Sequence, residues 1–178
     1  MKCTIQTIAT VKQIYQSFGD DGIFMFHRSL SIMKKMKTYG FHDDILIVAL
    51  LYYASVRFHI PITQIFNTFG YDISMMIYFL SYPAGGDAYS SAEAMNQYKK
   101  KILFGSECYP SIIVLKMLFD IDLLEAGKYK EDICFSQLKE QIQSCMADIY
   151  FQKFIENPPY SLIYQELSNI LSQKKLVS

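Results

Sequence analysis

Ten consecutive apolar residues, Ile45–Ala54, form the longest apolar run in the chain. A run of this length is too short to cross a bilayer, which takes about 20 residues. It has the length of a core helix that is apolar on all sides. Asp43 or Asp44, just before the run, is a residue type that commonly caps a helix. The run therefore predicts a central buried helix that ends near Phe58.

Apolar residues recur at helical spacing over most of the remaining chain. Turn residues separate the periodic segments, with chain breaks expected at Gly19–Gly22, Gly40, Gly70 and Pro83–Asp87. No segment has alternating apolar residues between hairpin turns. The pattern predicts an all-α fold with helices over about residues 5–15, 26–39, 43–58, 61–69, 72–82, 91–101, 111–125, 131–156 and 161–172.

After Gly127 the composition becomes more polar. We therefore expect a helical bundle over residues 1–128 and a C-terminal helical extension over 129–178, packed on the bundle or forming an interface. Large aromatic side chains are common anchors of protein interfaces. The aromatic residues that would anchor a protein partner or self-association are Tyr150, Phe151, Phe154, Tyr160 and Tyr164.

Charge and cysteine usage exclude several classes of protein. Seventeen Lys and Arg balance 17 Asp and Glu, so nothing favours a nucleic-acid partner, and the Lys99–Lys101 run is typical of a solvated helix face. The four cysteines form no Cys-x-x-Cys pair, which argues against a zinc site or a disulfide framework.

The N-terminus has no long apolar stretch, so we expect a cytoplasmic protein, or one secreted without a cleaved signal peptide. The usage of Lys, Ile and Tyr suggests an AT-rich bacterial genome.

Four features follow one another in a recognisable order. They are an early histidine (His27), the segment Ala49–Tyr53 in the central helix, a short helix closed by Phe69-Gly70, and the late segment Leu115–Phe119. This order resembles the HD hydrolase domain of the Rel/SpoT family of alarmone (guanosine tetraphosphate) enzymes, over about residues 5–125. The resemblance implies an HD-domain-like helical bundle with additional C-terminal helices.

The departures from that family lie at the metal ligands. Family members hold a divalent cation with a histidine, a His-Asp dyad and a later aspartate, and the cation activates a water for attack on phosphorus. His27 matches the first ligand, but Tyr52 and Tyr53 stand at the dyad and Phe119 at the late aspartate. A neutral phenol, with a pKa near 10, is a poor ligand, and phenylalanine offers no lone pair.

The resemblance therefore implies a catalytically inactive pseudo-hydrolase without a bound cofactor, acting as a protein-binding or regulatory module. Rings in place of charged ligands would fill a cavity that is costly when polar and empty. The vestigial pocket would comprise His27, Tyr52, Tyr53, Lys116 and Phe119.

Two other functions stay open. His42, Asp43 and Asp120 could form a displaced ligand set for a divalent metal such as manganese, and so serve a nucleotide phosphohydrolase, although His42-Asp43-Asp44 also fits a helix start. A guanine-nucleotide sensor that does not cleave its ligand would place Lys116 near phosphate. The segment before His27 lacks the basic, glycine-containing stretch that helps to bind the alarmone in family members.

Overall fold

The computed structural model describes residues 2–81, 92–127, 133–147 and 159–172. Every regular element in these residues is a helix, and none is a strand, which confirms the all-α prediction. None of the described helices combines the length and the apolar character that a membrane crossing requires.

The chain forms two compact units, Met1–Ala84 and Gly85–Ser178. The boundary that we expected between residues 128 and 129 therefore falls inside the second unit. The units divide within the sequence Pro83–Asp87, which lies outside the described residues.

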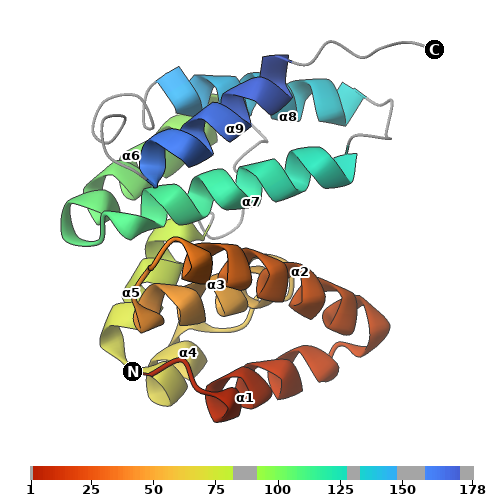
Figure 1. The fold of residues 1–178 in the computed structure, drawn as a ribbon, viewed down its shortest axis with the longest axis vertical. Helices are drawn as coiled ribbons and strands as arrows, with labels where there is room; N and C mark the ends of the chain where they lie inside the picture. The colour runs from red at the N-terminus through yellow and green to blue at the C-terminus, as the bar shows by residue number, and fades with distance from the viewer. Residues whose placement is uncertain (1, 82–91, 128–132, 148–158, 173–178) are drawn as a thin grey trace. The chain divides into compact units, whose positions relative to one another are not determined.

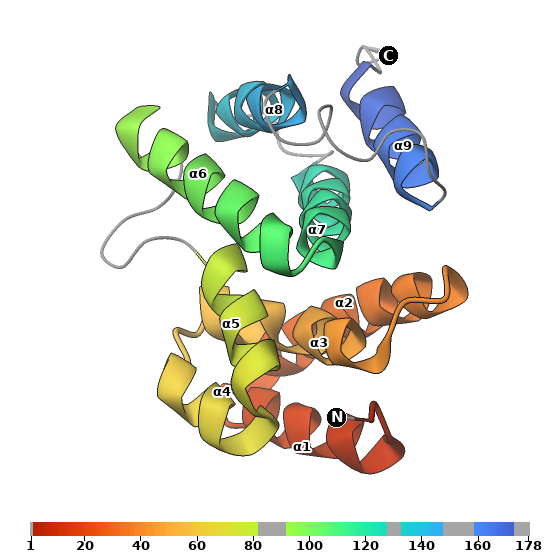
Figure 2. The ribbon, with the colours of Figure 1, turned by 90° about the vertical axis from the view of Figure 1, so that its left-hand side faces the viewer.

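The first unit is built around one central helix, α3 (Figures 1 and 2). Its helices are α1 (Ile5–Gln16), α2 (Gly19–Thr38), α3 (Asp43–Val56), α4 (Ile62–Phe69) and α5 (Tyr71–Leu80). Helix α3 packs against α1, α2 and α5, and α4 packs against α5. All residues from Ile45 to Ser55 are buried. The central buried helix predicted from the apolar run is confirmed.

Helices α1 and α2 approach each other closely at Gly22. A Cβ atom at this position would lie 1.9 Å from the main-chain oxygen of Tyr15, so only glycine fits. Our expectation that Gly19–Gly22 breaks the chain was wrong, because α2 already begins at Gly19. Asp20 and Asp21 lie in its first turn, where carboxylates interact favourably with the positive end of the helix dipole.

The entry to α4 and the junction between α4 and α5 follow the turn chemistry of the sequence. Pro61 immediately precedes α4, consistent with the preference of proline for helix starts. Gly70 alone separates α4 from α5, with a φ of 89°. This backbone conformation favours glycine, which lacks a Cβ atom.

The second unit is built around α7 (Figure 2). Its helices are α6 (Ala92–Cys108), α7 (Ser111–Gly127), α8 (Ile133–Cys145) and α9 (Tyr160–Ser172). Helix α7 packs against α6, α8 and α9, and its residues Ile112–Ile121 are all buried. In α6, Lys99 is 7% exposed and donates a hydrogen bond to the Ser144 hydroxyl of α8 at 2.5 Å. The solvated face expected for the Lys99–Lys101 run was therefore wrong for Lys99.

Candidate functional site

Tyr52 and Tyr53, which the sequence resemblance would place at the His-Asp dyad, lie on α3 in the core of the first unit. Their side chains are 2% and 5% exposed, and their ring centroids are 5.5 Å apart. His27, on α2, is exposed. The structure thus buries the two tyrosines and leaves the one matched histidine at the surface.

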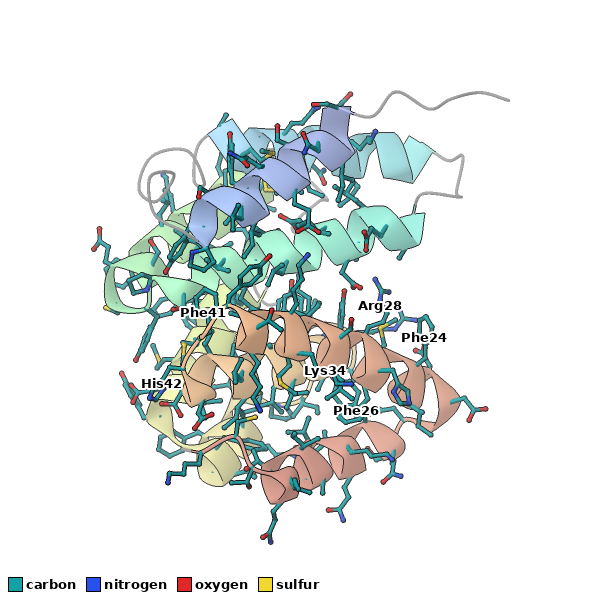
Figure 3. All side chains as sticks on the ribbon, in the orientation of Figure 1. Phe24, Phe26, Arg28, Lys34, Phe41 and His42 are labelled. Carbon is teal, nitrogen blue, oxygen red and sulfur yellow. The ribbon has the colours of Figure 1, made fainter. Side chains whose placement is uncertain are left out.

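Arg28, the neighbour of His27 on α2, lies close to Tyr53. Its guanidinium carbon lies 5.2 Å from the centroid of the Tyr53 ring and 5.9 Å from that of Phe24. Figure 3 shows Arg28 beside Phe24, whereas Phe26 lies on the side of α2 that faces α1. A cation over the face of an aromatic ring is attracted by the ring quadrupole. The Arg28 guanidinium therefore places a positive charge close to the Tyr53 ring.

Lys116 and Phe119 lie on α7 in the second unit. Phe119 is fully buried, and Lys116 is 2% exposed. The Lys116 ammonium forms an ion pair with Asp120, one turn along the helix and also fully buried, and lies 5.9 Å from the centroid of the Tyr98 ring. The expected pocket residues are therefore divided between the two units.

The alternative metal ligands are divided in the same way. His42 and Asp43 lie at the start of α3 in the first unit, and the His42 side chain is 84% exposed, 3.9 Å from Asp44. Asp120 lies in the second unit and is engaged by Lys116. Within the described ranges, no group of three or more His, Cys, Asp or Glu side chains is placed to hold a metal ion.

Two of the five aromatic residues expected at an interface lie within the described residues. Tyr160 and Tyr164 lie on α9 and are partly buried. Tyr150, Phe151 and Phe154 lie outside the described residues.

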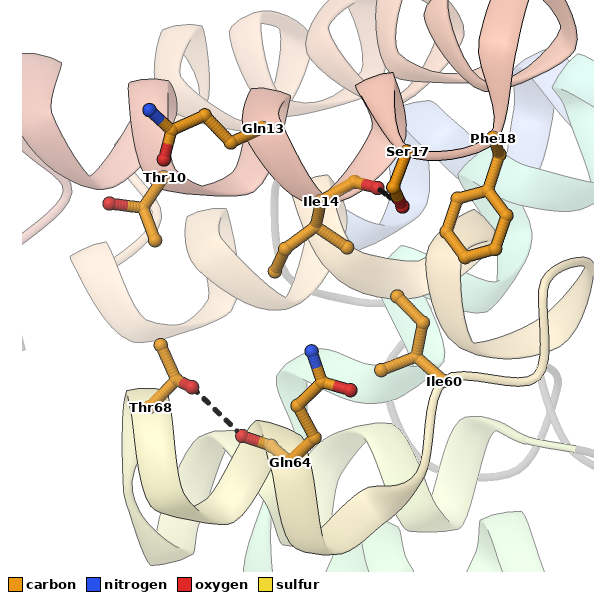
Figure 4. Close-up of a pocket in the computed structure, with 8 residues that line it drawn as sticks. All are labelled: Thr10, Gln13, Ile14, Ser17, Phe18, Ile60, Gln64 and Thr68. Carbon is orange, nitrogen blue, oxygen red and sulfur yellow. Dashed lines mark hydrogen bonds between the residues drawn. The ribbon is translucent and has the colours of Figure 1, made fainter.

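A groove between α1 and α4 was not predicted from the sequence (Figure 4). It has a volume of about 430 Å³, within the range typical of ligand sites. None of its lining residues is charged: Thr10, Gln13, Ile14, Ser17, Phe18, Ile60, Gln64 and Thr68. A signal for it was present, because α1 carries one charged residue, Lys12, and α4 carries none.

The three hydroxyl groups of the groove act as hydrogen-bond acceptors toward a ligand. Each donates its single hydrogen to a main-chain oxygen of its own helix: Thr10 to Gln6 at 3.0 Å, Ser17 to Ile14 at 2.7 Å, and Thr68 to Gln64 at 2.9 Å. The oxygen lone pairs remain as acceptors.

Two amides and an apolar end complete the groove. The side chains of Gln13 and Gln64 are exposed and form no hydrogen bond with the described part of the chain, so each offers a carbonyl and an NH₂ group. Phe18 and Ile60 lie at one end, and the Phe18 ring stacks on Phe58 with centroids 4.4 Å apart.

Tyr15 holds the α1 wall of the groove onto α3. Its buried hydroxyl donates to the main-chain oxygen of Leu50 at 2.9 Å and accepts from the Ala54 amide at 2.8 Å. The Ser29 hydroxyl lies 3.0 Å away and donates to it, because the single phenolic hydrogen is already used. Burial raises the pKa of Tyr15 well above its ordinary value, despite the hydrogen bonds from Ser29 and Ala54 that lower it.

Comparison of the chain with protein-family models, curated proteins and solved structures finds no match. The similarity to the HD hydrolase domain therefore rests on the order of residues in the sequence. It stays a prediction.

Proposed function

We propose that this chain is a catalytically inactive, HD-like pseudo-hydrolase that acts as a protein-binding module. One observation carries the proposal. Three of the four positions that would supply metal ligands in the resembled family hold Tyr52, Tyr53 and Phe119, which are 2%, 5% and 0% exposed.

The chemistry of these side chains supports loss of hydrolysis. A hydrolytic cation takes nitrogen and oxygen ligands and keeps an open position for water. Tyr52 and Tyr53 offer neutral phenols in a packed core, and Phe119 offers no ligand atom. The aromatic rings of Tyr52 and Tyr53 stabilise the core of the first unit through packing, and that of Phe119 the core of the second, whereas a vacated polar cavity would be costly.

The distribution of charge supports a role in protein binding. Protein interfaces are depleted in Lys, Glu and Asp at their centre and enriched in aromatic residues. The groove has no charged lining residue, and Phe18 at its end is 37% exposed. These features suit a protein ligand better than a phosphorylated nucleotide, whose charges would find no counter-charge in the groove lining.

The proposal is tested by measuring metal content and metal binding on the full chain. Mass spectrometry of the purified protein should find no stoichiometric divalent metal, and titration of EDTA-treated protein with manganese should leave the melting temperature unchanged. A native-state site at a hundredfold excess over its Kd would stabilise by about 2.7 kcal/mol. That would raise the melting temperature by roughly 5–10 °C for a chain of this size.

Stoichiometric metal with a clear thermal shift would overturn the proposal. His42→Ala and Asp43→Ala would then be tested as displaced ligands. If both variants lost the metal and the phosphohydrolase activity but kept the fold, the chain would be an enzyme.

A further inference from the structure

We propose that the groove between α1 and α4 binds an uncharged, extended peptide segment of a partner protein. This inference rests on the proposed binding function and assigns that function a site and a class of ligand. It is carried by three properties of the groove: its charge, its hydrogen-bonding groups and its apolar end.

Charged residues are unevenly distributed in the first unit. Residues 1–84 contain seven Lys and Arg and five Asp and Glu, yet only Lys12 lies on α1 and none lies on α4. Solvent-exposed helix faces are normally charged or polar, and charge depletion is the compositional signal of an interface centre. A charged segment would lose hydration in the groove without gaining a counter-charge. The complementary ligand is therefore uncharged.

The hydrogen-bonding groups of the groove select a ligand that donates N–H groups. The hydroxyls of Thr10, Ser17 and Thr68 only accept, because their hydrogens are bound to main-chain oxygens. The amides of Gln13 and Gln64 both donate and accept, as a peptide unit does. A peptide main chain presents N–H and C=O groups in alternation and matches this set.

The same groups favour an extended peptide over a helix. A helical ligand has satisfied its main-chain N–H and C=O groups internally, except at its ends. An extended segment leaves them free to bind neighbouring groups. The stretch from Thr10 on α1 to Ser17, which immediately follows α1, is about 10 Å long at 1.5 Å per residue. It therefore accommodates about three residues of extended chain.

The apolar end supplies a place for one aliphatic side chain. Ile14 from α1 and Gln64 from α4 point toward each other across the groove, and Phe18 and Ile60 close one end (Figure 4). An aliphatic side chain there would contact Ile14, Phe18 and Ile60 while the peptide main chain pairs with the amides. The expected core of the ligand is thus a short uncharged sequence with an aliphatic residue.

A random 12-residue peptide library displayed on phage, selected on the immobilised full chain, supplies the probe. We expect enriched peptides to share a short core that lacks Lys, Arg, Asp and Glu. One enriched peptide, made synthetically, is then titrated by calorimetry. The parent chain has no tryptophan, so Phe18→Trp adds a fluorescence reporter at the groove end. A tryptophan-free peptide should change its emission.

Matched variants locate the binding site. Gln64→Ala should weaken binding about 2- to 10-fold through the loss of neutral hydrogen bonds, and Ile14→Lys should weaken it more by adding a charge to the groove. Gln6→Ala, at an exposed α1 position outside the groove lining, should bind as the parent does. Unchanged melting temperatures would show that these variants remain folded.

Three outcomes would overturn the groove as the site: no enriched peptide, an enriched core that depends on charged residues, or equal affinity in Gln64→Ala, Ile14→Lys and the parent. None of them bears on the metal titration, which tests loss of hydrolysis separately. A peptide that binds equally to all groove variants would leave a binding module whose site lies elsewhere.

Discussion

The Tyr15 hydroxyl donates a hydrogen bond to the main-chain oxygen of Leu50 at 2.9 Å, within α3. The same hydroxyl accepts from the amide of Ala54 at 2.8 Å. Leu50 and Ala54 are four residues apart and would normally bond to each other in an α-helix. Tyr15 therefore bonds to the main chain of α3 at two positions one turn apart, and α1 is joined to the central helix through the main chain of that helix.

Tyr15→Phe should lower the free energy of unfolding by about 1–3 kcal/mol, because it removes two buried hydrogen bonds to the main chain of α3. Urea denaturation measures the change. Ser29→Ala, which removes only the hydroxyl that donates to Tyr15, should cost about 1 kcal/mol. The double variant should cost less than the sum, since the two residues share one network. A Tyr15→Phe protein as stable as the parent would show that these two hydrogen bonds do not stabilise the fold.

Tyr15 should also make the fold sensitive to strongly alkaline pH. Burial raises the pKa of Tyr15 above the value of about 10 expected in the unfolded chain. The folded state therefore favours the neutral phenol, so this contribution to stability is complete below about pH 10 and is lost as the pH rises above it. The chain has 14 tyrosines, so the parent must be compared with Tyr15→Phe in melting curves from pH 9 to 12. Identical pH profiles would contradict the prediction.

Lys101 on α6 should give a pH dependence of the opposite sign. Burial lowers the pKa of Lys101 to about 8, whereas a lysine in the unfolded chain has a pKa of about 10.4. Between these values the unfolded state binds more protons, so this group makes stability rise with pH from about 8 to about 10. The effect is small, because Lys101 is only partly buried and solvent screens its charge.

Lys101→Met should remove the rise, and Lys100→Met at the exposed neighbouring position should keep it. Melting curves in which both variants retain the rise would rule out Lys101 as its source.

The central helix of the first unit was foreseeable, and the contacts that join helices were not. Continuous apolar residues at 45–54 require burial on every side, so the sequence alone indicates a core helix there. Helical spacing placed Tyr15 on an apolar face. Nothing local indicates that its hydroxyl meets Ala54, 39 positions away. Gly22 was interpreted as a turn residue, because its role depends on how closely α1 approaches α2.

The candidate site was missed for a related reason. Glutamine and threonine have no distinctive chemistry alone, and Gln13 and Gln64 come together only in the folded unit. The low number of charged residues in α1 and α4 was visible in the sequence, but it could not indicate a groove until both helices were known to line one. The ligand set suggested by spacing has His42 and Asp43 in the first unit and Asp120 in the second, and it stays a prediction.

The buried pair of Lys116 and Asp120 gives the sharpest test of the second unit. Their side chains are 2% and 0% exposed, so removing one partner takes the opposite charge away from a buried ionic group. Lys116→Met should therefore lower the free energy of unfolding by about 3–5 kcal/mol. Replacing both, as Lys116→Met with Asp120→Leu, should recover much of that loss, because apolar residues of similar volume often substitute for a buried ion pair at little cost. Urea denaturation of the two single variants and the double variant measures the coupling. If the double variant were less stable than Lys116→Met, the pair would not account for the destabilisation, and Asp120 would have a stabilising role apart from Lys116.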